Sequence, residues 1–266
     1  MADAAARLTL LTRLGFAARG LLYIVIALLI LSKGDAEDPA GALAHVGQGG
    51  GRVLLGLIAV GLLAYGLWRL SDAALNIERH EGGGKGLLER LAAGASGVSH
   101  LLLAWQAVRL FRGAAAVAGN GAEDAAQSAL GLPGGPVLLT IAGLVLAAAG
   151  LFQLVKAARA GFLKHLEPAV ARAPWALWTG RAGYAARGLV FILIGLFVAQ
   201  AGLSARASEA GGMAEALGWL ARPWDLLAAL GLLGFGIFSL IEARYRMLHD
   251  VPIRGVGAGR LTTGRF

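Results

Sequence analysis

Arg13-Leu-Gly15-Phe-Ala17-Ala18-Arg19-Gly20-Leu21 is repeated 168 residues later as Arg181-Ala-Gly183-Tyr-Ala185-Ala186-Arg187-Gly188-Leu189. Between residues 13–28 and 181–196, ten of sixteen positions are identical. Each copy begins a long apolar run, so each places arginines at the start of a helix that is long enough to enter a membrane. An internal repeat of this kind predicts that the rest of the chain is built from the same unit.

Composition and hydropathy identify the class of protein. Of 266 residues, 57% are hydrophobic and 15% are charged, and the mean hydropathy is +0.68. A soluble domain of this size would need more polar surface than this chain can supply. The apolar residues form six runs, each close to the roughly 20 residues that span a bilayer. We predict transmembrane helices at about 14–32, 53–71, 91–111, 137–155, 182–201 and 224–241.

The net charge is +8, and the positions of the Lys and Arg residues along the chain indicate the membrane topology. If the six helices alternate in direction from a cytoplasmic N-terminus, eighteen Lys and Arg fall on the cytoplasmic side and six on the opposite side. This is the positive-inside pattern, and it predicts that both termini are cytoplasmic. A basic cytoplasmic face also suits a lipid bilayer that contains anionic lipid. Because no aromatic residues alternate with the basic ones, we expect no nucleic-acid partner.

A weaker third copy of the repeat lies between the two clear ones. Each copy has an arginine followed seven residues later by a glycine, and these pairs are Arg13 and Gly20, Arg90 and Gly97, and Arg181 and Gly188. The even-numbered apolar runs share a second pattern, Gly-x-aromatic, which begins at Gly66, Gly150 and Gly236. Short runs of helix-forming residues at 40–46, 124–130 and 213–220 predict brief surface helices between the spans.

The chain therefore divides into three helical hairpins within a single transmembrane domain. We place these units at 11–80, 86–166 and 178–248. Because each unit contains two helices, all three enter the membrane in the same direction, which is typical of parallel repeats related by an axis along the membrane normal. We predict an all-α membrane protein of six transmembrane helices with pseudo-threefold symmetry.

The motif resembles that of a bacterial family of integral membrane proteins catalogued as a domain of unknown function. That family has three two-helix units, each opening with Arg-x-Gly-x-x-Ala-Arg-Gly. Units one and three match the motif, whereas unit two has Ala92 for its glycine and Ser96 for its second arginine. The resemblance extends from about Leu11 to Arg246. It implies a multi-pass protein of the bacterial cytoplasmic (inner) membrane and implies no particular activity, substrate or cofactor.

Alignment of the three units brings polar residues into columns near the cytoplasmic side. The first helices contribute the column Arg19, Ser96 and Arg187 and, four residues later on the same face, the column Tyr23, His100 and Phe191. The second helices contribute the column Arg69, Gln153 and Ser239 and, three residues later, the column Asp72, Lys156 and Glu242. If these faces converge, they line a vestibule that is open to the cytoplasm.

Two sets of candidate site residues follow from these columns. The candidates for binding a ligand or a lipid headgroup are Arg19, Arg187, Ser96, His100 and Tyr23, since arginines in a partly dry pocket suit carboxylate or phosphate groups. The candidates for a charged ring at the cytoplasmic rim are Arg13, Arg90, Arg181, Asp72, Lys156 and Glu242.

The same residues also have structural interpretations. Arg19 and Arg187 lie close enough to the membrane boundary to extend their side chains to lipid headgroups. The charges could instead form ion pairs that hold neighbouring helices together, for example Asp72 with Arg13. Arg13 and Arg19 are six residues apart and point about 120° away from each other on a helix, so at most one of them faces the centre of the protein.

The sequence predicts no enzyme. Gly94-Ala-Ser96-Gly97 is similar to the motif of six-helix intramembrane serine proteases, but that chemistry needs a histidine base on a different helix. His100 lies on the same predicted helix as Ser96. Because the chain has no cysteine and only one histidine within the predicted spans, we also expect no metal and no other cofactor.

Three functions remain open. In the first, the vestibule binds or passes an anionic or amphipathic small molecule. In the second, the protein is an accessory or scaffolding subunit, and glycines of the second and sixth spans contact a partner membrane protein or another copy. These glycines would then be exposed in the monomer. In the third, the protein binds anionic lipid of the inner leaflet through Arg19 and Arg187.

Overall fold

The computed structural model is all-helical in the residues that it describes, which are 2–33, 38–48, 50–78, 82–114 and 121–247. Within these ranges, six helices are long and apolar enough to cross a membrane, which confirms that prediction. They are α1 (Ala2–Lys33), α3 (Arg52–Leu75), α4 (Gly84–Phe111), α6 (Gly135–Ala158), α8 (Pro174–Ser204) and α10 (Trp224–Tyr245).

Shorter helices occupy the connections. The three predicted brief helices are confirmed as α2 (Pro39–Gly47), α5 (Gly121–Leu130) and α9 (Met213–Trp219). The other short elements are η1 (Gly161–His165), α7 (Pro168–Ala171) and η2 (Ala207–Glu209). The start of α2 follows from its sequence, because Pro39 suits the first helical turn and Asp38 Oδ1 accepts a 2.7 Å hydrogen bond from the Gly41 N–H.

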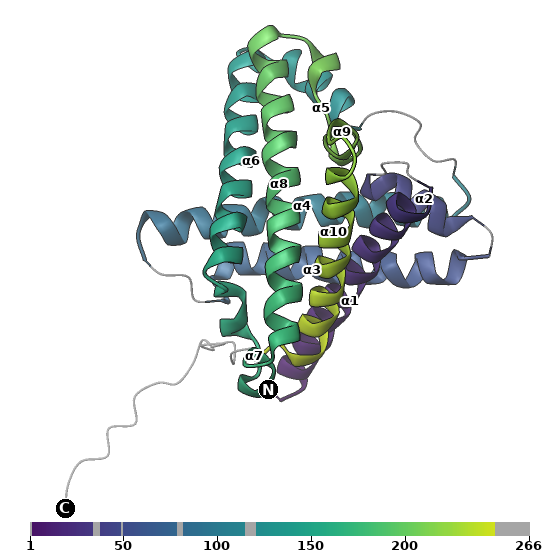
Figure 1. The fold of residues 1–266 in the computed structure, drawn as a ribbon, viewed down its shortest axis with the longest axis vertical. Coiled ribbons are helices and arrows are strands. Elements are labelled where there is room, and N and C mark those ends of the chain that lie inside the picture. Colours follow the sequence, from purple (N-terminus) through teal and green to yellow (C-terminus); the bar gives the residue numbers. More distant parts are fainter. Residues whose placement is uncertain (1, 34–37, 49, 79–81, 115–120, 248–266) are drawn as a thin grey trace, which may run out of the picture.

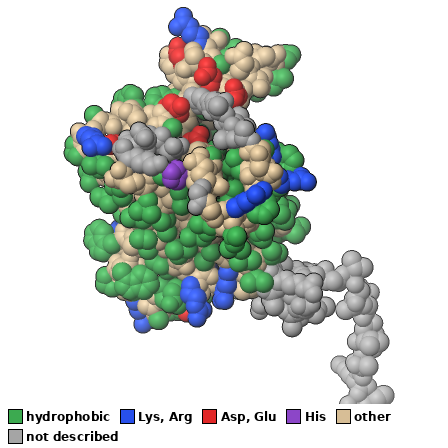
Figure 2. All heavy atoms as spheres, turned by 90° about the vertical axis from the view of Figure 1, so that its right-hand side faces the viewer, with side chains coloured by type: hydrophobic (Ala, Val, Ile, Leu, Met, Phe, Trp, Pro, Cys, Tyr) green, Lys and Arg blue, Asp and Glu red, His purple; other side chains and the backbone are tan. Residues whose placement is uncertain are grey.

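The surface has the character expected of a protein in a bilayer. Figure 2 shows a broad band of hydrophobic side chains on one face, bordered below by Lys and Arg and above by both acidic and basic side chains. Large apolar residues such as Leu57 and Leu102 are more than half exposed. Lipid tails would cover such residues without cost, whereas water would not.

The principal helix contacts join neighbouring units. The three pairs are α3 with α4, α6 with α8, and α10 with α1, so the second helix of each unit packs against the first helix of the next. Within units, α1 also packs on α3 and α8 on α10. Among the described residues, α4 and α6 of the second unit have no comparable contact with each other.

The directions of the helices are not all alike. Figure 1 places the starts of α1 and α8 at the same end of the molecule as the ends of α6 and α10. The α3–α4 pair runs across the direction of α6 and α8 in the same view. The pseudo-threefold arrangement and the cytoplasmic position of the termini therefore stay predictions.

The repeated glycines form the same close crossing in each of the three pairs. A methyl group added at Gly20 would lie 2.8 Å from the Gly236 carbonyl oxygen. The corresponding distances are 3.0 Å from Gly97 to the Gly66 oxygen and 2.8 Å from Gly188 to the Gly150 oxygen. Only glycine permits backbones to approach this closely. The final glycine of the repeated motif is therefore a helix-packing residue.

The glycines that the scaffolding hypothesis requires to be exposed are in contact with the chain itself. In α3, added methyl groups at Gly61 and Gly66 would lie less than 3 Å from α1 and α4, respectively. In α10, Gly231 and Gly236 make equally close approaches to α8 and α1. These glycine faces are therefore unavailable to a partner protein in this structure.

Candidate functional site

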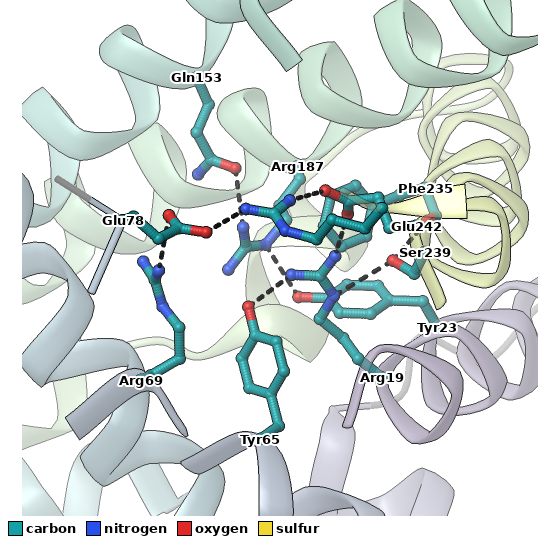
Figure 3. A network of polar contacts seen from close by, with 11 residues as sticks. Arg19, Tyr23, Tyr65, Arg69, Glu78, Gln153, Arg187, Phe235, Ser239 and Glu242 are labelled. Carbon is teal, nitrogen blue, oxygen red and sulfur yellow. Dashed lines mark hydrogen bonds and ion pairs between the residues drawn. The ribbon is translucent and has the colours of Figure 1, made fainter. Parts of the chain in front are cut away.

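Arg19 lies in the interior of the protein, where three helices meet. Its side chain extends from α1 and is almost completely buried. Arg19 Nη1 donates to the Tyr65 hydroxyl on α3 (2.6 Å), and Nη2 donates to Glu242 Oε2 on α10 (2.6 Å). Arg19 Nε donates to Ser239 Oγ (3.1 Å), also on α10. The second arginine of the first motif thus joins α1, α3 and α10 (Figure 3).

Aromatic rings replace water around this buried charge. The Arg19 guanidinium carbon lies 4.6 Å from the centre of the Phe16 ring, 5.0 Å from that of Tyr65 and 4.9 Å from that of Phe235. The negative faces of aromatic rings attract a cation, and the attraction is stronger where the cation is desolvated. This environment, together with Glu242, explains how an arginine is accommodated inside a set of apolar helices.

Glu242 is the centre of a longer chain of charges. Its second oxygen, Oε1, accepts a 2.6 Å bond from Arg246 Nη1, so each carboxylate oxygen has its own arginine. Arg246 also donates to Glu78, which follows α3. Arg69 Nη1 lies 3.7 Å from the other Glu78 oxygen and 3.4 Å from Asp72 Oδ2. The end of α10 is thereby linked to the end of α3.

We call these charged residues, together with Arg187, the polar cluster. Its members are Arg19, Arg69, Asp72, Glu78, Arg187, Glu242 and Arg246. Figure 3 shows the labelled members Arg19, Arg69, Glu78, Arg187 and Glu242 extending toward one another from different parts of the chain.

Arg187, the counterpart of Arg19 in the third unit, has different partners. Its Nη1 donates to Gln153 Oε1 on α6 (2.9 Å), and its Nε donates to the Tyr23 hydroxyl on α1 (3.0 Å). Its guanidinium carbon lies 4.5 Å from the centre of the Phe191 ring. All of these partners are neutral. Within the part of the chain that the structure describes, Arg187 has no carboxylate partner.

The remaining binding candidates lie beside the cluster. His100 Nδ1 donates a 2.7 Å bond to the Ser96 carbonyl oxygen, and since a carbonyl only accepts, the ring proton is on Nδ1. The centre of the His100 ring lies 4.5 Å from that of Tyr65, which is bonded to Arg19. Arg19 is part of the network itself, whereas Arg187 and Tyr23 bond to each other and meet Arg19 across the Phe235 ring, which both guanidinium groups face at 4.9 and 5.0 Å. His100 reaches Arg19 through Tyr65.

The six residues predicted as a charged rim do not form a single ring. Arg13 is exposed, whereas Asp72 and Glu242 are buried in the polar cluster. Arg90 donates to the carbonyl oxygens of residues 73 and 74 at the end of α3, and Arg181 donates to that of residue 158 at the end of α6. Carbonyls in the last turn of a helix lack intrahelical donors and carry partial negative charge, which explains these two contacts.

Arg69 and Ser239 were in the aligned columns but not among the candidate site residues, and three further members of the network, Tyr65, Glu78 and Arg246, lay outside the columns altogether. Tyr65 lies one helical turn before Arg69, and Arg246 lies four residues after Glu242 at ion-pair spacing. These spacings are signals that the sequence does contain. Glu78 has no such signal. It reaches the cluster because the chain leaves α3 and turns back, so that the Glu78 N–H donates to Asp72 Oδ1 (2.8 Å).

The arginines around Glu78 determine its protonation. Burial by itself raises the pKa of this carboxyl group, but Arg246 and Arg69 outweigh burial and lower the pKa to about 2 from an ordinary value of 4.5. A carboxylate with a lowered pKa in the folded state stabilises the protein above its unfolded pKa. This stabilisation is lost as the pH falls from about 5 toward 2 and amounts to about 3 kcal/mol.

We therefore expect the E78Q variant to lose less stability in acid than the parent protein. Melting temperatures measured in detergent at pH 7 and pH 3 test this expectation. His165, whose pKa is lowered to about 3 chiefly by burial and then by Arg246, changes stability in the same direction with pH. The test therefore compares the fall in melting temperature from pH 7 to pH 3 of the parent protein with that of E78Q. Identical losses in acid would contradict the assignment to Glu78.

Comparison with known proteins identifies the family. The family model described as "Domain of Unknown Function (DUF1206)" matches three segments, residues 14–76, 91–160 and 182–246. A relative in Bacillus subtilis (strain 168), "Uncharacterized protein YxxB", is 29% identical over 249 residues, covering 88% of this chain and 90% of that protein. No solved structure matches the chain. The three matched segments confirm the repeated architecture, and the chain belongs to the family Domain of Unknown Function (DUF1206).

Proposed function

We propose that this protein binds or passes an anionic or amphipathic small molecule at the polar cluster, without catalysing a reaction. The observation that carries the proposal is the charge of the cluster. It contains four arginines and three carboxylates, so one positive charge has no acidic partner among the residues that the structure describes. The unmatched residue is Arg187.

An unmatched charge inside a membrane protein needs a physical reason. Transfer of an isolated charge to an apolar environment costs several kcal/mol, roughly, even after the protein has relaxed around it. The hydroxyl of Tyr23 and the amide of Gln153 solvate Arg187 only in part. A bound anion would complete this solvation and would gain charge-assisted hydrogen bonds in doing so.

The contacts between the repeated units are consistent with such a site at the centre of the protein. Each of the three equivalent glycine crossings joins the second helix of one unit to the first helix of the next. This supports a pseudo-threefold arrangement with the cluster between the units. The positive-inside pattern supports an orientation in which the cluster faces the cytoplasm of a bacterial cell, on the anionic side of the inner membrane.

The test compares anionic and neutral amphiphiles that have the same chain. The purified protein is melted in a neutral detergent with added dodecyl phosphate or, separately, with added dodecanol. We expect dodecyl phosphate to stabilise the protein selectively, by about 2.7 kcal/mol when its concentration is 100 times the dissociation constant. Sodium chloride at equal ionic strength controls for screening. Equal effects of the two compounds would contradict the proposal.

A further inference from the structure

We infer that the anion is a phosphate group and that it binds between α6 and α8, where Arg187 and Lys156 are its ligands. This inference rests on the proposed function and assigns it to one of the three helix pairs. The second arginine of the motif is present in two of the pairs, α1–α10 and α6–α8, so it does not by itself locate the site. The distinction comes from comparing what occupies the corresponding positions in each of them.

The α1–α10 pair supplies the reference arrangement. Arg19 on α1 donates to Ser239 (3.1 Å) and, one turn further along α10, to Glu242 (2.6 Å). The arginine of the motif therefore contacts two successive columns of the facing helix, first a neutral residue and then an acid. The positive charge is balanced within the pair.

The α6–α8 pair repeats the first contact and reverses the charge at the second position. Arg187 donates to Gln153 (2.9 Å), which occupies the column of Ser239. The position equivalent to Glu242 is Lys156. Where Arg19 faces a carboxylate, Arg187 is therefore accompanied by a second cation. In the third pair, which has Ser96 in the arginine column, Arg69 and Asp72 are 3.4 Å apart on α3 and balance one another.

The two cations are held on adjacent levels of the same helix interface. Gln153 and Lys156 are three residues apart on α6, and Tyr184 and Arg187 are three residues apart on α8, so each pair shares one helix face. Lys156 Nζ lies 4.6 Å from the centre of the Tyr184 ring. The Arg187–Gln153 bond and the Lys156–Tyr184 contact are thus neighbouring cross-links between α6 and α8.

Both cations retain donors for a ligand. Arg187 uses Nε and Nη1 within the protein, and its Nη2 makes no hydrogen bond to any described residue. The Lys156 ammonium lies against the Tyr184 ring and interacts electrostatically with Glu242, but it makes no hydrogen bond or ion pair to a residue that the structure describes. Both side chains are half-buried. A guanidinium nitrogen and an ammonium on adjacent levels suit a doubly charged group with several oxygen acceptors, which is the chemistry of a phosphate.

The surroundings admit either a soluble phosphate or the phosphate of a lipid. α6 is the least buried of the six long helices, and α4, which lacks packed contact with α6, is the next. A lipid can therefore reach α6 from the bilayer. Both kinds of ligand present a phosphate group. Binding of inorganic phosphate would indicate a soluble ligand, and binding of phosphatidic acid would indicate a lipid.

The test exchanges Lys156 for the acid found at the equivalent position of the reference pair. We expect K156E to fold, because the α1–α10 pair carries an acid, Glu242, at the equivalent position. The same variant should bind at least tenfold more weakly to inorganic phosphate, or to nanodiscs of phosphatidylcholine with 20% phosphatidic acid, whichever the parent protein binds. K156R, which keeps the charge, should retain binding.

K164E is the matched control, since it makes the same charge change at an exposed residue of η1 that is not a proposed ligand. It should leave binding within twofold of the parent value. Binding by the parent that K156E and R187Q both leave intact would overturn the assignment to α6 and α8 while preserving the proposed function. Failure of the parent protein to bind either probe, or dodecyl phosphate, would overturn both. If K164E lost as much binding as K156E, the loss would be explained by net charge alone, and the assignment of the site to Arg187 and Lys156 would be wrong.

Discussion

Replacement of Arg19 by alanine is expected to lower the free energy of unfolding by about 4 kcal/mol, which is typical of removing one partner of a buried ion pair. The variant leaves Glu242 with Arg246 as its remaining arginine partner, and it removes the donors to Tyr65 and Ser239. It also removes the cation around which Phe16 and Phe235 are packed. Reversible unfolding of the purified protein in mixed detergent micelles, followed by circular dichroism, measures the change.

The control for this experiment is R13A in the same helix and the same motif. Arg13 is exposed, so its removal should change the free energy of unfolding by less than about 0.5 kcal/mol, as at most surface positions. The double variant R19A/E242A should lose less stability than the sum of the two single variants, because the two residues interact directly. Equal effects of R19A and R13A would show that the buried pair does not stabilise the fold.

Replacement of Gly150 by leucine is expected to separate α6 from α8 and to cost about 3 kcal/mol or more, at the upper end of overpacking effects. A methyl group at Gly150 would already lie 2.6 Å from the Gly188 carbonyl oxygen and 2.8 Å from the Ile192 backbone nitrogen. Both neighbours are backbone atoms, so no change of side-chain rotamer relieves the clash. The melting temperature in detergent measures the loss.

Ala148→Leu provides the matched control, because residue 148 is exposed on the same helix, two residues from Gly150. This control should melt within a few degrees of the parent protein. Because Arg187 and Lys156 lie on the two sides of the α6–α8 interface, the Gly150 variant should also lose its stabilisation by dodecyl phosphate. A Gly150 variant that melts like the Ala148 variant would contradict the close crossing.

The sequence predicted the architecture well because the signals for it are local and repeated. Six apolar runs of bilayer length were sufficient to predict six long helices, and the helices in the connections follow from short runs of helix formers. The glycine seven residues after each first arginine also recurs in all three units. Its role became clear only when the structure placed Gly20, Gly97 and Gly188 against the glycines of neighbouring units.

The candidate site was predictable only in part. The columns placed Arg19, Ser239 and Glu242 in three separate sets on the cytoplasmic side, and only the structure showed that Arg19 bonds to the other two. They could not show that Glu78 and Arg246 join the network, since both residues lie beyond the helices from which the columns were built. The expected rim of six charges likewise failed to form a ring, because two of its arginines bind helix-end carbonyls instead.

By itself, the sequence determined the membrane class, the six helices and the threefold repetition, because hydropathy and repeats are properties of the chain that need no long-range contact. Only the tertiary structure decided which charges are matched. Arg19 and Arg187 are indistinguishable in the motif, yet one meets Glu242 and the other meets Gln153 beside Lys156. The free energy of a buried charge depends on its neighbours within a few ångströms, and helices distant in sequence supply those neighbours.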